Sequence, residues 1–120
     1  MKNILIVEDE EIIGFLHSKH IQSLGNYRTF LVSEADEYLN RLKNKDIDLV
    51  LMDVQLGLET DGVDLAKLGL QYHDAPVVFV TGDVESVPPS VIESEPAYKG
   101  VLPKPLRKEN ILELFEKLSI

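Results

Sequence analysis

Five polar side chains stand at or just after the ends of short apolar runs, and these are Glu8, Asp9, Asp53, Thr81 and Lys104. Asp53, for example, closes the apolar run over residues 49–52, which is typical of a parallel strand covered on both faces. Ligands of an open α/β sheet bind outside the carboxyl ends of its strands, so a carboxylate there is placed for chemistry. Taken alone, Asp53 could equally end a strand and begin a turn.

Five strands and about five helices are expected to position these side chains. Apolar and β-branched runs predict strands over residues 4–7, 27–32, 48–53, 76–81 and 100–102. Helical periodicity predicts helices over about 8–24, 34–43, 61–70, 90–95 and 106–118. This alternation predicts a flavodoxin-like (βα)5 three-layer α/β sandwich, with a parallel sheet in the order 2-1-3-4-5 and helices on both faces. Glu8 and Asp9 would then stand beside Asp53.

Local signals predict the faces and ends of the helices. Apolar residues at the helical period indicate the buried stripe of the first helix, and these are Ile12, Ile13, Leu16, Ile21 and Leu24. Ser33 is expected to cap the second helix, with Asp36 as its capping-box partner. Pro88, Pro89 and Pro96 allow only a short fourth helix.

Composition limits the possible functions. The 120 residues, 44% hydrophobic and 28% charged, suit one soluble globular domain. There is no cysteine, which excludes disulfides, thiolate catalysis and zinc–thiolate sites. The net charge of −9 argues against direct binding of nucleic acid or an anionic membrane. No apolar segment has the length of a membrane span or a signal peptide, so a cytoplasmic protein is expected.

Three histidines are too few for a rich metal cluster. His17 and His20 lie three residues apart on the predicted first helix, a spacing that a metal pair could use. Exposed surface histidines are the simpler expectation for both residues.

The order and spacing of Glu8, Asp9, Asp53, Thr81 and Lys104-Pro105 over five strands resemble those of response-regulator receiver domains from two-component signalling. The resemblance covers essentially the whole chain, so one receiver domain over residues 1–120 is expected. It implies that Asp53 is the phosphoacceptor, whose carboxylate attacks the phosphorus of a phosphohistidine donor and forms an acyl phosphate.

The resemblance also implies a Mg²⁺ cofactor and two further contacts to the phosphoryl group. Asp9 would bind the ion directly and Glu8 through water, while Asp53 and the backbone carbonyl of Gln55 would supply further ligands. Lys104 would contact a phosphoryl oxygen, preceding a cis peptide bond to its proline. Thr81 would hydrogen-bond the phosphoryl group once it is present.

The resemblance further implies the partners. A sensor histidine kinase or a histidine phosphotransfer protein would be the donor. A changed surface around the fourth helix, fifth strand and fifth helix would control an unknown downstream protein or attached effector domain. Such a domain is a signalling switch that catalyses its own phosphorylation and dephosphorylation, and is not an enzyme with a separate substrate.

The sequence departs from the family's pattern in two places. Val101 stands three residues before Lys104, where the family usually has Tyr or Phe, and Tyr98 is a nearby aromatic that could substitute. The loop over residues 55–62 lacks the common proline and is one residue longer than usual. Gln55 and Asp83 occupy the positions at which the family tunes dephosphorylation, and both could orient a water.

Other functions fit these residues less well. An aspartyl-phosphate hydrolase needs a second Asp two residues after the nucleophile, where this chain has Gln55. A nucleotide site needs a glycine-rich turn after the first strand, where the acidic residues 8–11 would repel phosphates. The alternative that stays open is a pseudo-receiver, an interaction module that keeps the fold without being phosphorylated.

Overall fold

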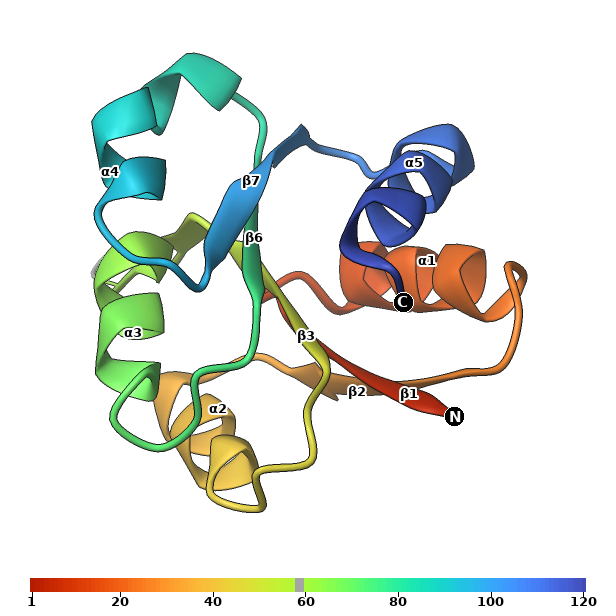
Figure 1. Cartoon of the computed structure of the whole chain (residues 1–120), viewed down its shortest axis with the longest axis horizontal. Helices are drawn as coiled ribbons and strands as arrows, with labels where there is room; N and C mark the ends of the chain where they lie inside the picture. The colour runs from red at the N-terminus through yellow and green to blue at the C-terminus, as the bar shows by residue number, and fades with distance from the viewer. Residues whose placement is uncertain (58–59) are drawn as a thin grey trace.

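Five parallel strands form the central sheet of the structure, a computed structural model that describes residues 1–57 and 60–120 (Figure 1). The strands are β1 (Lys2–Val7), β2 (Tyr27–Val32), β3 (Leu49–Asp53), β6 (Val77–Thr81) and β7 (Tyr98–Pro103). They lie in the order β2-β1-β3-β6-β7, which confirms the predicted order 2-1-3-4-5. A short antiparallel pair, β4 (Gln55–Leu56) and β5 (Thr60–Asp61), follows β3. The predicted long loop includes Leu58 and Glu59, which lie outside the described residues.

Helices cover both faces of the sheet (Figure 1). The helices are α1 (Glu11–Gln22), α2 (Ala35–Leu42), α3 (Gly62–Gly69), α4 (Pro89–Glu93) and α5 (Lys108–Leu118). On one face, Leu5 and Phe79 of the sheet pack in one apolar core with Tyr38 of α2. On the other face, Ile21 of α1 and Phe115 of α5 share a second core with the sheet. In the described part of the chain, every helix is too short or too polar to span a bilayer.

The buried face of α1 differs from the predicted stripe. Ile21 is buried as expected, but Ile12 is 83% exposed, and Leu16 is exposed as well. The helix instead buries Gly14, His17, Ser18 and Ile21. Small side chains at 14 and 18 let α1 lie close to β2, and the Ser18 hydroxyl lies 2.6 Å from the Thr29 hydroxyl of that strand. The prediction of the buried face was wrong because the polar side chains of His17 and Ser18 are buried with hydrogen-bond partners in place of the apolar residues Ile12 and Leu16.

The start of α2 also differs from the prediction, whereas α4 agrees with it. Glu34, not Ser33, is the N-cap residue of α2. The Ser33 backbone N–H donates to Glu37 Oε1 at 3.3 Å, so the reciprocal partner is Glu37 and not Asp36. Helix α2 begins at Ala35, two residues after Ser33. The side chain that bonds back to the Ser33 N–H is therefore that of Glu37, one residue further along than predicted. Helix α4 is five residues long and has Pro89 in its first turn.

The start of α3 is packed against the end of β3. The Gly62 backbone N–H donates to the carbonyl oxygen of Val54 at 2.6 Å, and the Asp61 side chain accepts from the Val63 N–H at 2.7 Å. A Cβ atom on Gly62 would overlap the backbone carbonyl of Asp53. A glycine is therefore required where α3 passes the residue that closes β3.

We expect Gly62→Ala to lower the free energy of unfolding by about 2 kcal/mol, because the backbone of Asp53 and Val54 must move to admit a methyl group. Gly82→Ala is the matched control, since a Cβ atom at Gly82 meets nothing within 4 Å. The control should change stability by less than about 0.5 kcal/mol. Urea denaturation measures both variants, and equal effects would contradict the packing argument.

Candidate functional site

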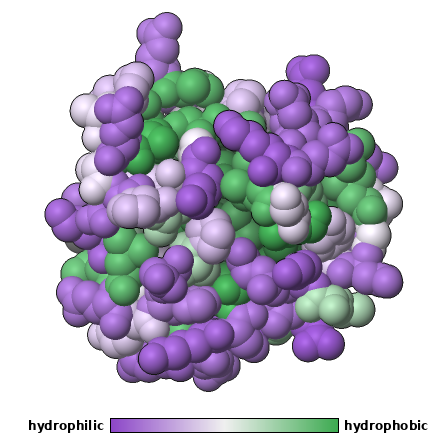
Figure 2. Space-filling view, viewed as in Figure 1, coloured by the Kyte–Doolittle hydropathy of each residue, from purple (hydrophilic) through white to green (hydrophobic). Residues whose placement is uncertain are grey.

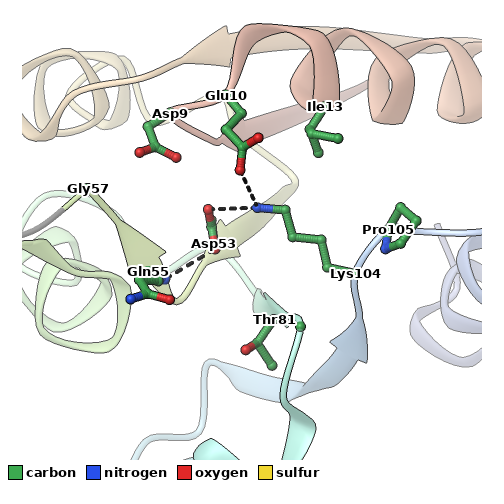
Figure 3. A pocket seen from close by; sticks show the side chains of 10 residues that line it. Asp9, Glu10, Ile13, Asp53, Gln55, Gly57, Thr81, Lys104 and Pro105 are labelled. Atoms are coloured by element: carbon green, nitrogen blue, oxygen red, sulfur yellow. Dashed lines mark hydrogen bonds and ion pairs between the residues drawn. The ribbon is translucent and has the colours of Figure 1, made fainter.

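The polar side chains singled out in the sequence gather at one edge of the sheet (Figure 3). The register pairs Val7 with Met52, and Thr81 with Pro103, so the carboxyl ends of β1, β3, β6 and β7 are neighbours. A pocket of about 520 Å³ opens there, and its lining residues are Asp9, Glu10, Ile13, Asp53, Gln55, Gly57, Thr81, Gly82, Lys104 and Pro105. Glu8 is buried and joins this group through Lys104.

The ammonium group of Lys104 is shared by three carboxylates. Its Nζ atom lies 2.6 Å from Glu8 Oε1, 3.1 Å from Asp53 Oδ2 and 3.9 Å from Glu10 Oε1. Figure 3 shows the lysine chain reaching across the pocket toward Asp53 and Glu10. The Lys104 backbone N–H donates to the carbonyl oxygen of Thr81 at 2.8 Å, which holds the base of this side chain beside β6.

Burial and charge shift the titration of this group. Burial raises the pKa of Glu8 to about 7, and the nearby Asp53 carboxylate adds to the rise while Lys104 opposes it. Burial alone would lower the pKa of Lys104, but its ion pairs with Glu8 and Asp53 outweigh burial and raise it. The lysine is therefore held charged, and its single charge is divided between two buried carboxylates.

The carboxylate of Asp53 is held in place at both oxygens. Asp53 is only 4% exposed. Its Oδ1 accepts the backbone N–H of Gln55 at 3.1 Å, and its Oδ2 accepts from Lys104 Nζ. A buried carboxylate with fixed orientation at the floor of an open pocket can attack an electrophile or bind a cation.

Three neighbouring carboxylates offer oxygen ligands for a metal ion. One oxygen each from Glu8, Asp9 and Glu10 lies within 4.8 Å of the others. Carboxylate oxygens suit a hard cation such as Mg²⁺. Glu10 was not singled out in the sequence analysis, where it was only one of the acidic residues 8–11 that would repel phosphates. Its position directly after Glu8 and Asp9 was the available signal, but only the fold turns its side chain toward Lys104 (Figure 3).

The hydroxyl of Thr81 lines the pocket but is bonded to its own turn. Its Oγ1 donates to the Asp83 carbonyl at 3.3 Å and accepts the Asp83 N–H at 3.1 Å. The Asp83 side chain in turn accepts from Glu85 N–H at the start of the 3₁₀ helix Val84–Ser86. Gln55 and Asp83 both line a second pocket of about 610 Å³, which also contains Thr81.

Tyr98 cannot replace the aromatic residue that is missing at Val101. Tyr98 pairs with Val77 at the start of β6, whereas Thr81 ends that strand. Four strand residues separate the two positions, or about 13 Å. Tyr98 is buried and packs its ring edge-on against Phe79, with centroids 5.0 Å apart. The idea that Tyr98 could substitute near Thr81 is therefore wrong.

The segment after Lys104 holds one confirmed expectation and one correction. The Lys104–Pro105 peptide bond is cis, as expected. His17, expected at the surface, is 2% exposed, and its Nε2 accepts the backbone N–H of Leu106 at 3.0 Å. His20 Nδ1 lies 3.1 Å from the carbonyl oxygen of Leu106. The two histidines of α1 thus form hydrogen bonds with the backbone of Leu106, the residue after Pro105.

Comparisons with known proteins agree with this fold and arrangement. The family described as the response regulator receiver domain matches residues 4–116. The transcriptional regulatory protein BaeR of Escherichia coli O6:H1 is 34% identical over 84 residues, which cover 70% of this chain and 34% of that protein. The transcriptional regulatory protein YvrH of Bacillus subtilis is also 34% identical, over 80 residues that cover 66% of this chain and 33% of that protein.

Solved receiver domains have the same fold. The N-terminal domain of a response regulator/sensory box/GGDEF 3-domain protein from Carboxydothermus hydrogenoformans superposes with a TM-score of 0.83 at 27% identity, covering 98% of this chain and 93% of that one. This chain spans only about a third of the two curated relatives named above. The family match over 4–116 and the shared fold place the chain in the response regulator receiver domain family of two-component signalling.

Proposed function

We propose that this receiver domain accepts a phosphoryl group on Asp53 from a phosphohistidine donor, in a reaction that requires Mg²⁺. The observation that carries the proposal is the pairing of a buried, oriented Asp53 carboxylate with the Lys104 ammonium, 3.1 Å away, at the floor of an open pocket. The same pocket is lined by the carboxylates of Asp9 and Glu10.

The proposed step is a displacement at phosphorus. An Asp53 carboxylate oxygen attacks the phosphorus atom, and the bond from phosphorus to the donor's imidazole nitrogen breaks, with its electron pair leaving on that nitrogen. The product is an acyl phosphate. Lys104 would contact a phosphoryl oxygen, which offsets negative charge as the group is transferred. Gln55 keeps one Asp53 oxygen oriented through its backbone N–H.

The acidic residues of the pocket would hold the metal ion. Asp9, Asp53 and the backbone carbonyl of Gln55 would be its ligands, with Glu8 acting through water. Glu8, Asp9 and Asp53 carry a formal charge of −3 when ionised, and Lys104 reduces it only to −2. When bound, Mg²⁺ supplies the positive charge that lets an anionic phosphoryl group approach.

The output would pass through the turn that begins at Thr81. Its hydroxyl would leave the Asp83 backbone for a phosphoryl oxygen, and a hydrogen bond to such a charged group contributes about 1.5–3 kcal/mol. That is enough to shift a two-state domain roughly ten- to a hundredfold. Figure 2 shows hydrophobic surface over the 3₁₀ helix and α4, where Val84 is 42% exposed. We propose that the face of α4, β7 and α5 contacts a downstream protein or an attached effector domain.

The donor would be a sensor histidine kinase or a histidine phosphotransfer protein. The curated relatives are about three times as long as the stretch that this chain matches. We therefore propose that an effector region, where one is attached to this domain, is controlled by the same phosphorylation. A pseudo-receiver that acts only by protein contact is the competing function, and loss of Asp53 distinguishes the two.

Incubation with acetyl phosphate and Mg²⁺ should add one phosphoryl group to the protein, as detected by intact mass spectrometry. Asp53→Asn should abolish this gain because it removes the attacking carboxylate, and excess EDTA should abolish it in the unchanged protein. Asp74→Asn is the matched control, since the Asp74 side chain is 94% exposed and lies outside the pocket. Equal labelling of the unchanged protein and Asp53→Asn, or full labelling in EDTA, would contradict the proposal.

Without metal, Glu8 should make folding stability fall as the pH rises. Its pKa is about 7 in the folded protein against an ordinary value of 4.5, so the folded state holds the proton more tightly. This contribution is complete below about pH 4.5 and is lost as the pH rises through about 7. The stability of the unchanged protein relative to Glu8→Gln should fall by about 2 kcal/mol over this range.

Urea denaturation in EDTA at several pH values measures this difference. Comparison with Glu8→Gln isolates Glu8 from other groups, such as His17, whose burial lowers its pKa to about 4 and acts in the opposite direction. Glu11→Gln is the matched control: it changes an exposed glutamate of α1 but keeps Glu8, so it should follow the pH curve of the unchanged protein. A Glu8→Gln protein that follows the pH curve of the unchanged protein would contradict the assignment.

A further inference from the structure

Helix α1 presents two imidazole rings to one backbone residue, Leu106. The Leu106 N–H donates to His17 Nε2 at 3.0 Å, and His20 Nδ1 donates to the Leu106 carbonyl at 3.1 Å. Both contacts join residues more than 80 positions apart in the sequence. The Leu106 side chain is itself buried in the core between α1 and α5, which cover the same face of the sheet (Figure 1).

The polar contact of His17 is a specific one, because a buried imidazole is costly without a partner. His17 is buried, and its Nε2 must be unprotonated to accept a hydrogen bond. Burial lowers the pKa of His17 to about 4, and the positive charges of Lys104 and His20 act in the same direction while Asp53 opposes them. The ring is therefore a neutral acceptor at physiological pH.

The contact lies two residues after the lysine that pairs with Asp53. Lys104 is held on one side by the hydrogen bond from its N–H to the Thr81 carbonyl. Pro105 has no N–H, and Leu106 lies two residues before Lys108, the first residue of α5. The histidines of α1 thus supply the hydrogen bonds that hold the segment on its other side. Helix α1 also begins directly after Glu8, Asp9 and Glu10, so it joins the acidic side of the pocket to the lysine side.

We propose that His17, assisted by His20, is a positioning residue for Lys104: by binding the Leu106 backbone it fixes the turn from which the lysine reaches Asp53. The inference rests on the proposed phosphorylation of Asp53 for its effect on rate. The structural part of the inference, that His17 sets the pairing of Lys104 with Asp53 and Glu8, holds whether or not Asp53 is phosphorylated.

A positioning role for His17 predicts that its loss lowers the rate of phosphorylation but leaves the affinity for Mg²⁺ almost unchanged. His17→Leu fills the buried position with an apolar side chain but removes the acceptor for the Leu106 N–H. The rate of phosphorylation at saturating acetyl phosphate and Mg²⁺ should then fall about tenfold, as expected for loss of one buried hydrogen bond that orients the lysine. The affinity for Mg²⁺, followed by NMR titration, should change less than about twofold, because the proposed ligands are not touched.

Two further variants separate positioning from general loss of structure. His17→Gln places an amide oxygen at the position of Nε2 and should restore the rate to within about threefold of the unchanged protein. His73→Leu removes another contact between a histidine ring and the backbone, that of His73 Nε2 with the Ile47 carbonyl at 2.8 Å, away from the pocket. It should leave the rate unchanged. Urea denaturation confirms that each variant is folded.

A second readout does not depend on phosphorylation. In the metal-free protein, the side-chain ¹⁵Nζ resonance of Lys104 should move toward that of a free lysine in His17→Leu, and should stay in place in His17→Gln and His73→Leu. If the unchanged protein accepts no phosphoryl group but this shift is seen, the proposed function fails and the positioning role stands. If folded His17→Leu keeps both its rate and its Lys104 resonance, or loses Mg²⁺ affinity as much as rate, the positioning role is overturned.

Discussion

The arrangement depends on one lysine that compensates several carboxylates. Glu8 and Asp53 are almost fully buried, and buried carboxylates are stable only when they are paired or bind a cation. The Lys104 ammonium lies within 3.1 Å of both. The parallel order of the strands brings the three residues to one edge, and the bond from Lys104 N–H to the Thr81 carbonyl sets the start of the lysine chain.

One ammonium group is not enough to balance this pocket. Asp9 and Glu10 face the same space, and burial next to Asp53 raises the pKa of Glu8. A site with excess negative charge and only oxygen donors favours a hard divalent cation. The electrostatic imbalance, the Mg²⁺ requirement and the phosphoacceptor role of Asp53 are therefore parts of one proposal.

The fold followed from the sequence because its signals are local and repeated. Unbroken apolar runs predicted the strands, and the residues closing those runs predicted which edge would hold the polar groups. The faces of α1 could not be predicted in the same way, because periodicity shows which residues share a face but not which face meets the sheet. Gly14 and Ser18 decide that, since their small size allows close packing on β2.

Two wrong predictions about residues outside the pocket, His17 and Tyr98, have a similar physical cause. The hydrogen bond of His17 is to a backbone group 89 residues away, which no local pattern encodes. Tyr98 is near Lys104 in sequence, but an extended strand carries it to the far end of β6. Tyr98 is close to Lys104 in the sequence but not in the fold, whereas His17 is far from Leu106 in the sequence but contacts it in the fold.

The most direct test of the central claim is to locate the phosphoryl group by chemical trapping. Borohydride reduces an acyl phosphate to an alcohol, so phosphorylated aspartate becomes homoserine, which tandem mass spectrometry can place in the sequence. The account predicts homoserine at position 53 after treatment with acetyl phosphate and Mg²⁺, and none there without the donor. Homoserine at position 9, or a labelled protein with an unmodified Asp53, would contradict it.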